Sequence, residues 1–171
     1  MKGSSFSPDV KDFIKLLAKY NVRYVIVGGE AVIYYGFVRL TGDIDFFYES
    51  SGENANRLFS ALLEFWQGTI PGIKKVDDLV GEDVIIQFGI IPNRIDLITS
   101  IDGVEFKEVW EDRLEEKILI GNKEYPIYFI GLDQLIKNKE SAKRDKDLMD
   151  VKYLYALKKK APPSPNSKGD S

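Results

Sequence analysis

The sequence contains neither cysteine nor histidine among its 171 residues. The absence of cysteine excludes a disulfide framework and thiolate chemistry. The absence of histidine excludes serine and cysteine triads, zinc hydrolase sites built on imidazole, and the usual imidazole general base. A metal site in this chain must therefore rely on oxygen ligands, which suit magnesium, manganese or calcium.

Long apolar runs are missing as well. No segment approaches the roughly 18 consecutive apolar residues that a membrane-spanning helix needs. The N-terminal segment MKGSSFSPDVKDF has no apolar core of the signal-peptide kind. The chain nevertheless has 44% hydrophobic residues, which is typical of a globular protein. These features together predict a cytoplasmic protein without a membrane partner.

Acidic and basic residues are distributed unevenly along the chain, whose formal net charge is -3. Nine Lys/Arg and five Asp/Glu lie between residues 132 and 160, so residues 1–131 carry the acidic excess. This distribution suits binding of a polyanion. Metal held by the acidic part of the chain would contact it on one side, and Lys and Arg of the C-terminal helices would contact it on the other. A solvated basic helix face explains the same pattern, and charge alone favours that simpler explanation.

Hydrophobic periodicity and turn residues predict the order of the elements. Helices are expected at residues 8–20, 30–35, 54–66, 131–139 and 143–159. Strands are expected at residues 24–27, 43–48, 84–88, 94–98, 114–120 and 123–128, the last four forming two hairpins. This order predicts a single α/β (α+β) domain over residues 1–160, with a mixed sheet flanked by helices and a C-terminal helical pair. Residues 161–171 are rich in Pro, Ser and Gly and are expected to form a disordered tail.

Three aspartates on two of these strands form the candidate metal site. Asp43 and Asp45 are two residues apart, so strand alternation places both carboxylates on one face and Ile44 on the other. Two neighbouring carboxylates repel each other unless a proton or a cation lies between them. Asp96, flanked by apolar residues, is expected on the open face of a neighbouring strand. Three such acids would provide oxygen ligands for one or two Mg²⁺ or Mn²⁺ ions, as in sites of phosphoryl and nucleotidyl transfer.

Each part of this site also has a structural explanation. An Asp-x-Asp pair is frequent by chance, and without further context it is more often structural or solvated than catalytic. Asp96 alone could end a strand. Carboxylates more than roughly 8 Å apart would be incompatible with the ~3.5–4 Å metal spacing of two-metal sites.

Gly28 and Gly29 follow a predicted strand and precede a predicted helix. Backbone N–H groups at such a corner can bind phosphate oxygens, and glycine leaves room for their approach. In isolation, a plain tight turn is the simpler interpretation. The spacing fits neither a Walker A loop nor the Rossmann fingerprint. Arg39 and Thr41 lie just before the acids, where Arg39 could contact a phosphate or hold a carboxylate in place.

Charged residues on the inward faces of the two C-terminal helices are further candidates. Lys139 continues the apolar stripe of its helix, and Asp147 shares a face with Val151 and Leu154 in the next helix. Asp147 could simply pair with Arg144 and complement the helix dipole. Otherwise, inward charges from two helices indicate the wall of a cleft.

These residues together resemble the polymerase-beta-type nucleotidyltransferase superfamily, over roughly residues 20–155. The similarity runs from Val25–Gly29 (VIVGG) through Arg39–Asp45 (RLTGDID) to Asp96. It is greatest with the minimal prokaryotic branch that includes abortive-infection nucleotidyltransferase toxins. Members of that branch carry a later Lys followed by Arg-x-Lys-Asp, which here are Lys139 and Arg144–Asp147 (RDKD).

The resemblance implies a nucleotidyltransferase fold and a division of roles. The residues expected to act in catalysis are Asp43, Asp45, Asp96 and Asp147. The first three would bind metal, and Asp96 could instead take the proton of an acceptor hydroxyl. The residues expected to contact the nucleotide are Gly28, Gly29, Arg39, Thr41, Lys139 and Arg144. Asp147 would support Lys139 or act as a base.

The implied activity is Mg²⁺- or Mn²⁺-dependent transfer of a nucleoside monophosphate from an NTP, such as ATP, to an acceptor hydroxyl. The acceptor stays open between an RNA end such as that of tRNA, a protein and a small molecule, and a toxin would have an antitoxin partner. Glu30 stands where many superfamily members have Ser or Thr, and a carboxylate there would repel a triphosphate. The alternative hypothesis is therefore a non-catalytic nucleotide-binding or regulatory protein that retains the fold.

Overall fold

The computed structural model describes residues 6–160. The strands are β1 (Tyr24–Val27), β2 (Asp43–Tyr48), β3 (Ile85–Phe88), β4 (Arg94–Ile98), β5 (Leu114–Ile120) and β6 (Lys123–Phe129). The helices are α1 (Pro8–Lys19), α2 (Gly28–Tyr34), α3 (Gly52–Phe65), α4 (Phe106–Glu111), α5 (Leu132–Ala142) and α6 (Asp145–Lys160), with a 3-10 helix η2 (Val76–Leu79). The expected tail at residues 161–171 lies outside the described residues.

Each helix and strand predicted from the sequence is present, with its ends shifted by a few residues. Helix α2 begins at Gly28 itself, because the glycine corner forms the first turn of the helix. The sequence pattern did not predict α4 or η2, which have six and four residues and are too short to show a hydrophobic period. Ser7 is the N-cap of α1, since its hydroxyl accepts a hydrogen bond from the backbone N–H of Val10.

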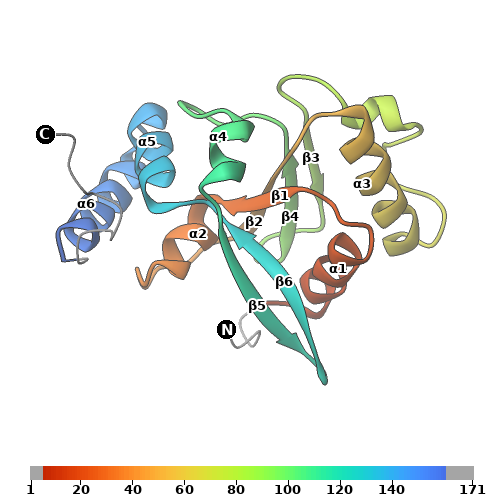
Figure 1. Ribbon diagram of the computed structural model, residues 1–171, viewed down its shortest axis with the longest axis horizontal. Coiled ribbons are helices and arrows are strands. Elements are labelled where there is room, and N and C mark those ends of the chain that lie inside the picture. Colours follow the sequence, from red (N-terminus) through yellow and green to blue (C-terminus); the bar gives the residue numbers. More distant parts are fainter. Residues whose placement is uncertain (1–5, 161–171) are drawn as a thin grey trace, which may run out of the picture.

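The strands form one six-stranded mixed sheet in the order β3-β4-β2-β1-β6-β5 (Figure 1). Both predicted hairpins, β3–β4 and β5–β6, are antiparallel pairs. Strand β2 pairs antiparallel with β1 and parallel with β4. In the parallel pair, Asp45 lies opposite Asp96 and Asp43 lies opposite Arg94. The pairing therefore brings together two short acidic segments that are far apart in the sequence.

Helices cover both faces of this sheet (Figure 1). Helices α1 and α3 pack on one face, where Ile26 and Phe46 join the larger hydrophobic cluster. Helices α2, α4, α5 and α6 contribute to a second cluster on the other face, which contains Val25 and Phe47. Strand alternation thus divides the apolar side chains of the central strands between two cores.

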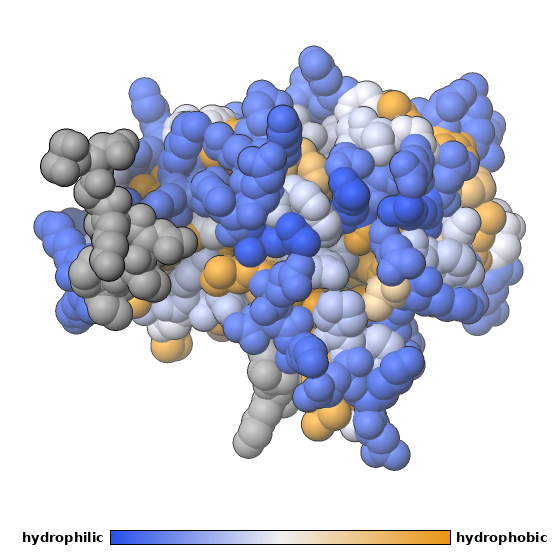
Figure 2. Space-filling view, in the orientation of Figure 1, coloured by the Kyte–Doolittle hydropathy of each residue, from blue (hydrophilic) through white to orange (hydrophobic). Residues whose placement is uncertain are grey.

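The surface shown in Figure 2 is mainly hydrophilic, and hydrophobic side chains appear on it in small, separate groups. The large aromatic and aliphatic side chains of β1 and β2 are instead buried between the layers. Within residues 6–160, no helix combines the length and the apolar character that crossing a membrane would require.

Candidate active site

Three carboxylates meet on the face of the sheet that α2 and α5 cover. Asp43, Asp45 and Asp96 each offer an oxygen, and these oxygens all lie within 4.8 Å of one another. Ile44 is buried in the cluster on the opposite face, as the strand alternation predicted. The side chains converge because β2 and β4 run parallel in a register that places Asp45 opposite Asp96. The separation is well below the roughly 8 Å that would have excluded a shared metal site.

The carboxyl group of Asp45 has a pKa far above its ordinary value. Burial and the negative charges of Asp43 and Asp96 raise the pKa of Asp45 to about 7, although the ammonium of Lys139 opposes the shift. Such a carboxylate is only partly ionised at neutral pH. The cluster therefore holds more negative charge than its surroundings neutralise. A bound cation would reduce the repulsion between these carboxylates.

Arg94 forms ion pairs with the other two acids, and it was not among the site residues expected from the sequence. Its Nη2 donates to Oδ2 of Asp43 at 2.8 Å, and its Nε donates to Oδ1 of Asp96 at 2.8 Å. Within residues 6–160, no ion pair reaches Asp45. The signal was present in the sequence, because Arg94 and Asp96 are two residues apart on one strand and must share a face.

Glu30 lies beside the same cluster. It lines a small cavity together with Asp43 and Arg94. Burial and then the charge of Asp43 raise the pKa of Glu30. Its carboxylate makes no hydrogen bond or ion pair with another residue in the described part of the chain. Glu30 therefore faces the acids as an additional, unpaired carboxylate.

The glycine corner packs directly against residues of the expected nucleotide site. Gly28 has a φ of +68° and leaves no room for a side chain beside Asp45. A Cβ on Gly29 would lie 2.7 Å from both Nη2 of Arg39 and Oγ1 of Thr41. The hydroxyl of Thr41 also lies 3.2 Å from the backbone carbonyl of Asp43, to which it donates. The segment before β2 and the start of α2 are thus neighbours at one side of the acids.

Lys139 of α5 lies in a buried network of charges with α6. Its side chain is 2% exposed, and its Nζ lies 3.1 Å from an oxygen of Asp147 and 3.1 Å from an oxygen of Asp150. Arg144 donates through Nε to Asp147 at 2.7 Å, and Arg39 donates through Nη1 to Asp150 at 3.2 Å. The inward directions expected for Lys139 and Asp147 are confirmed by their burial. The burial of Asp150 was not predicted, although it is three residues after Asp147 on the same helix face.

This charge network adjoins the acid cluster and sets three cationic side chains against two carboxylates. Burial raises the pKa of Asp147, but the hydrogen bonds from Arg144 and Lys139 outweigh it and lower the pKa below its ordinary value. Asp147 is therefore ionised at neutral pH and compensates the buried ammonium. In this arrangement Lys139 is enclosed by carboxylates, so contact with a phosphate would require it to exchange one of them.

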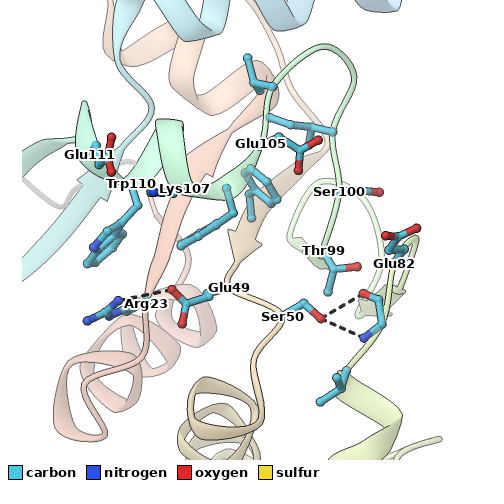
Figure 3. A pocket seen from close by; sticks show the side chains of 16 residues that line it. Arg23, Glu49, Ser50, Glu82, Thr99, Ser100, Glu105, Lys107, Trp110 and Glu111 are labelled. Carbon is cyan, nitrogen blue, oxygen red and sulfur yellow. Dashed lines mark hydrogen bonds and ion pairs between the residues drawn. The ribbon is translucent and has the colours of Figure 1, made fainter.

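A cavity of about 730 Å³ on another part of the molecule is lined by none of the three acids. Figure 3 shows Trp110 of α4 on one side of it and the ion pair between Arg23 and Glu49 nearby. Phe47, two residues after Asp45 on the same face of β2, is buried and forms part of the cavity wall. The acid cluster is therefore not part of the wall of this cavity.

Comparison with known proteins supports a family assignment. A family model described as a nucleotidyltransferase of unknown function (DUF6036) matches residues 8–158. The matched span contains the glycine corner, the three acids, α5 and all but the last two residues of α6. No curated protein matches the chain.

Proposed function

The chain belongs to this family of nucleotidyltransferases of unknown function, and from that premise we propose that it transfers a nucleoside monophosphate from an NTP to an acceptor hydroxyl. The superfamily and fold inferred from the sequence are confirmed by the same match. The observation that carries the proposed activity is the convergence of Asp43, Asp45 and Asp96 to within 4.8 Å.

The three carboxylates fit Mg²⁺ or Mn²⁺, because hard oxygen ligands are those that these ions prefer. The raised pKa of Asp45, about 7, supports the fit, since it reflects burial of the carboxylate and then the negative charges of Asp43 and Asp96. When bound there, the ions would neutralise phosphate charge and make the attacking hydroxyl more acidic. Asp43 and Asp45 would hold the ions that accompany the nucleotide, and Asp96 would complete the site.

The protein's own groups have defined tasks in this reaction. The triphosphate would lie along the glycine corner, where Arg39 and Thr41 can donate to its oxygens. Asp96 would accept the proton as the acceptor oxygen attacks the α-phosphorus, and the bond from that phosphorus to the leaving pyrophosphate would break. Lys139 and Arg144 would contribute positive charge near the leaving group.

The acceptor must present a hydroxyl oxygen to the α-phosphorus. An RNA end such as that of tRNA, a protein hydroxyl and a small molecule each provide the attacking oxygen that the chemistry needs. A role as a toxin, with an antitoxin partner, would follow from the identity of that acceptor.

A second candidate function rests on Glu30, which lies near Asp43 in the first turn of α2. An unpaired carboxylate close to the expected phosphate position opposes the approach of a triphosphate. The second candidate is therefore a non-catalytic nucleotide-binding or regulatory protein with this fold. The Asp43→Asn variant separates the two, because an enzyme would lose essentially all turnover while a binding protein could retain its ligand.

The first experiment is calorimetric titration of ATP, GTP, CTP and UTP, with and without Mg²⁺. The unaltered chain is compared with the Asp43→Asn/Asp45→Asn variant. The matched control is Asp77→Asn/Glu82→Gln, which removes the same charge at exposed residues outside the acid cluster. Mg²⁺-dependent binding that only the first variant abolishes would support the proposal. If the unaltered chain binds none of the four at millimolar concentration with Mg²⁺ or Mn²⁺, the proposed activity is wrong.

A further inference from the structure

We propose that Arg94 is a built-in cation that competes with the metal for the acid cluster, and that Glu30 receives its guanidinium when the metal binds. The inference rests on the proposed function, because it concerns the same metal site. It gives Arg94 and Glu30 roles at the metal site that were not expected from the sequence.

The contacts of Arg94 occupy the oxygens that a metal would use. The guanidinium bridges the two strands, with Nη2 2.8 Å from Oδ2 of Asp43 and 3.0 Å from Oδ2 of Asp96. Its Nε holds the remaining oxygen of Asp96 at 2.8 Å. Both oxygens of Asp96 are therefore engaged by one guanidinium. Arg94 takes the bridging position between these two acids that a divalent ion would take.

A guanidinium and a divalent ion cannot share these carboxylates without repulsion. Both are cations, and the bridged oxygens belong to groups that all lie within 4.8 Å. Coulomb repulsion at such distances is strong where water is partly excluded. Asp96 is itself buried, so the surroundings would screen the repulsion poorly. Binding of the metal would therefore favour an arrangement in which Arg94 releases Asp96.

Glu30 is the residue that can accept the released guanidinium. It lines one small cavity with Asp43 and Arg94, and within residues 6–160 its carboxylate has no hydrogen-bond or ion-pair partner. A partly buried carboxylate without a partner is unfavourable, and pairing with a guanidinium would relieve this. Arg94 already lines the same cavity as Glu30, so a change of side-chain rotamer is the movement that the inference requires. A Ser or Thr at residue 30 could not provide this counter-charge.

Two simpler roles make opposite predictions. If Arg94 only orients the carboxylates and remains in place, its removal should weaken metal binding. If Glu30 is a further metal ligand, its removal should weaken metal binding whether or not Arg94 is present. Competition predicts that removal of Arg94 increases the metal affinity. It also predicts that removal of Glu30 changes the metal affinity only while Arg94 is present.

The test measures Mn²⁺ affinity directly, by calorimetry and by the electron paramagnetic resonance signal of free Mn²⁺. Arg94→Gln should bind Mn²⁺ ~10-fold more tightly than the unaltered chain, and Glu30→Gln several-fold more weakly. The double variant should match Arg94→Gln. Arg57→Gln removes the same charge at the surface and should leave the affinity unchanged.

Each outcome decides the inference. If Arg94→Gln binds Mn²⁺ more weakly than the unaltered chain, the proposed competition is wrong. If Glu30→Gln lowers the Mn²⁺ affinity equally with and without Arg94, the proposed role of Glu30 is wrong. If Arg94→Gln does not fold by circular dichroism, Arg94→Lys replaces it, since lysine lacks the planar fork with which the guanidinium holds both oxygens of Asp96 and should also allow tighter binding. If neither the unaltered chain nor the Arg94 variant binds Mn²⁺, the metal site of the proposed function is itself absent. Binding that appears only without Arg94 would support the inference most directly.

Discussion

The carboxylate of Asp45 occupies the space in which a side chain at Gly28 would begin. A Cβ built on Gly28 would lie 2.1 Å from Oδ2 of Asp45, which is far inside van der Waals contact. The backbone of Gly28 is also left-handed, with a φ of +68°. Two independent requirements therefore select glycine at the point where β1 turns into α2.

We expect Gly28→Ala to lower stability and to displace Asp45. Left-handed backbone alone costs a non-glycine residue ~1–2 kcal/mol, and the clash with Asp45 adds to that cost. Gly121→Ala is the matched control, since Gly121 has a φ of +62° with no atom within 4 Å of its Cβ position. Urea unfolding should show a clearly larger loss for Gly28→Ala. Equal losses would mean that Asp45 moves aside freely.

Gly29→Ala tests the space between α2 and the segment before β2. Gly29 has ordinary helical backbone, so alanine should change the free energy of unfolding by less than about 1 kcal/mol. Its Cβ would lie 2.7 Å from Arg39 Nη2 and Thr41 Oγ1, and would push both away from the expected phosphate position. We expect ~10-fold weaker Mg²⁺–NTP binding by calorimetry, on the scale of one lost charged contact. An unchanged affinity would remove this corner from the nucleotide site.

The raised pKa of Asp45 predicts a pH dependence of the metal-free chain. Asp45 titrates near 7 in the fold and near its ordinary 3.8 when unfolded, so the folded state binds the additional proton between these values. Stability should therefore fall as pH rises from about 4 to about 7, by at most ~4 kcal/mol from this group. Thermal melts in a chelator should show this slope reduced in Asp45→Asn. Identical slopes would contradict the prediction.

The same linkage applies to the metal. Mn²⁺ must displace the proton of Asp45, so it should raise the melting temperature more at pH 8 than at pH 5. The Asp45→Asn variant should show little stabilisation at either pH. Equal stabilisation of the unaltered chain at both pH values would indicate that Mn²⁺ binds elsewhere.

Lys139 holds two buried carboxylates, and its removal should be costly. Lys139→Met leaves Asp147 and Asp150 with less compensation and should lower stability by ~3–5 kcal/mol. Neutralising the acids as well, in Lys139→Met/Asp147→Asn/Asp150→Asn, should restore part of the loss. The control is Lys137→Met, whose ion pair with Glu108 is solvent-exposed and should contribute less than about 1 kcal/mol. Denaturant unfolding of the four chains measures these differences.

The sequence predicted the local structure well because local rules govern it. Strand alternation placed Asp43 and Asp45 on one face, and helical spacing directed Lys139 inward. The same alternation places Arg94 on the face of β4 that carries Asp96, so this contact too follows from a local rule. Helix α4 could not be found in this way, since six residues do not display a helical period.

The sequence by itself determined which helices and strands form. It also determined on which face of each helix or strand the charged side chains lie. Only the tertiary structure decided that Asp96 meets Asp45, because that contact depends on parallel pairing and register between β2 and β4, which are distant in the chain. Sheet order likewise brought Glu30 against Asp43 and Arg94. Such pairings are selected by the packing of the whole sheet between its two helical layers, and no local pattern encodes them.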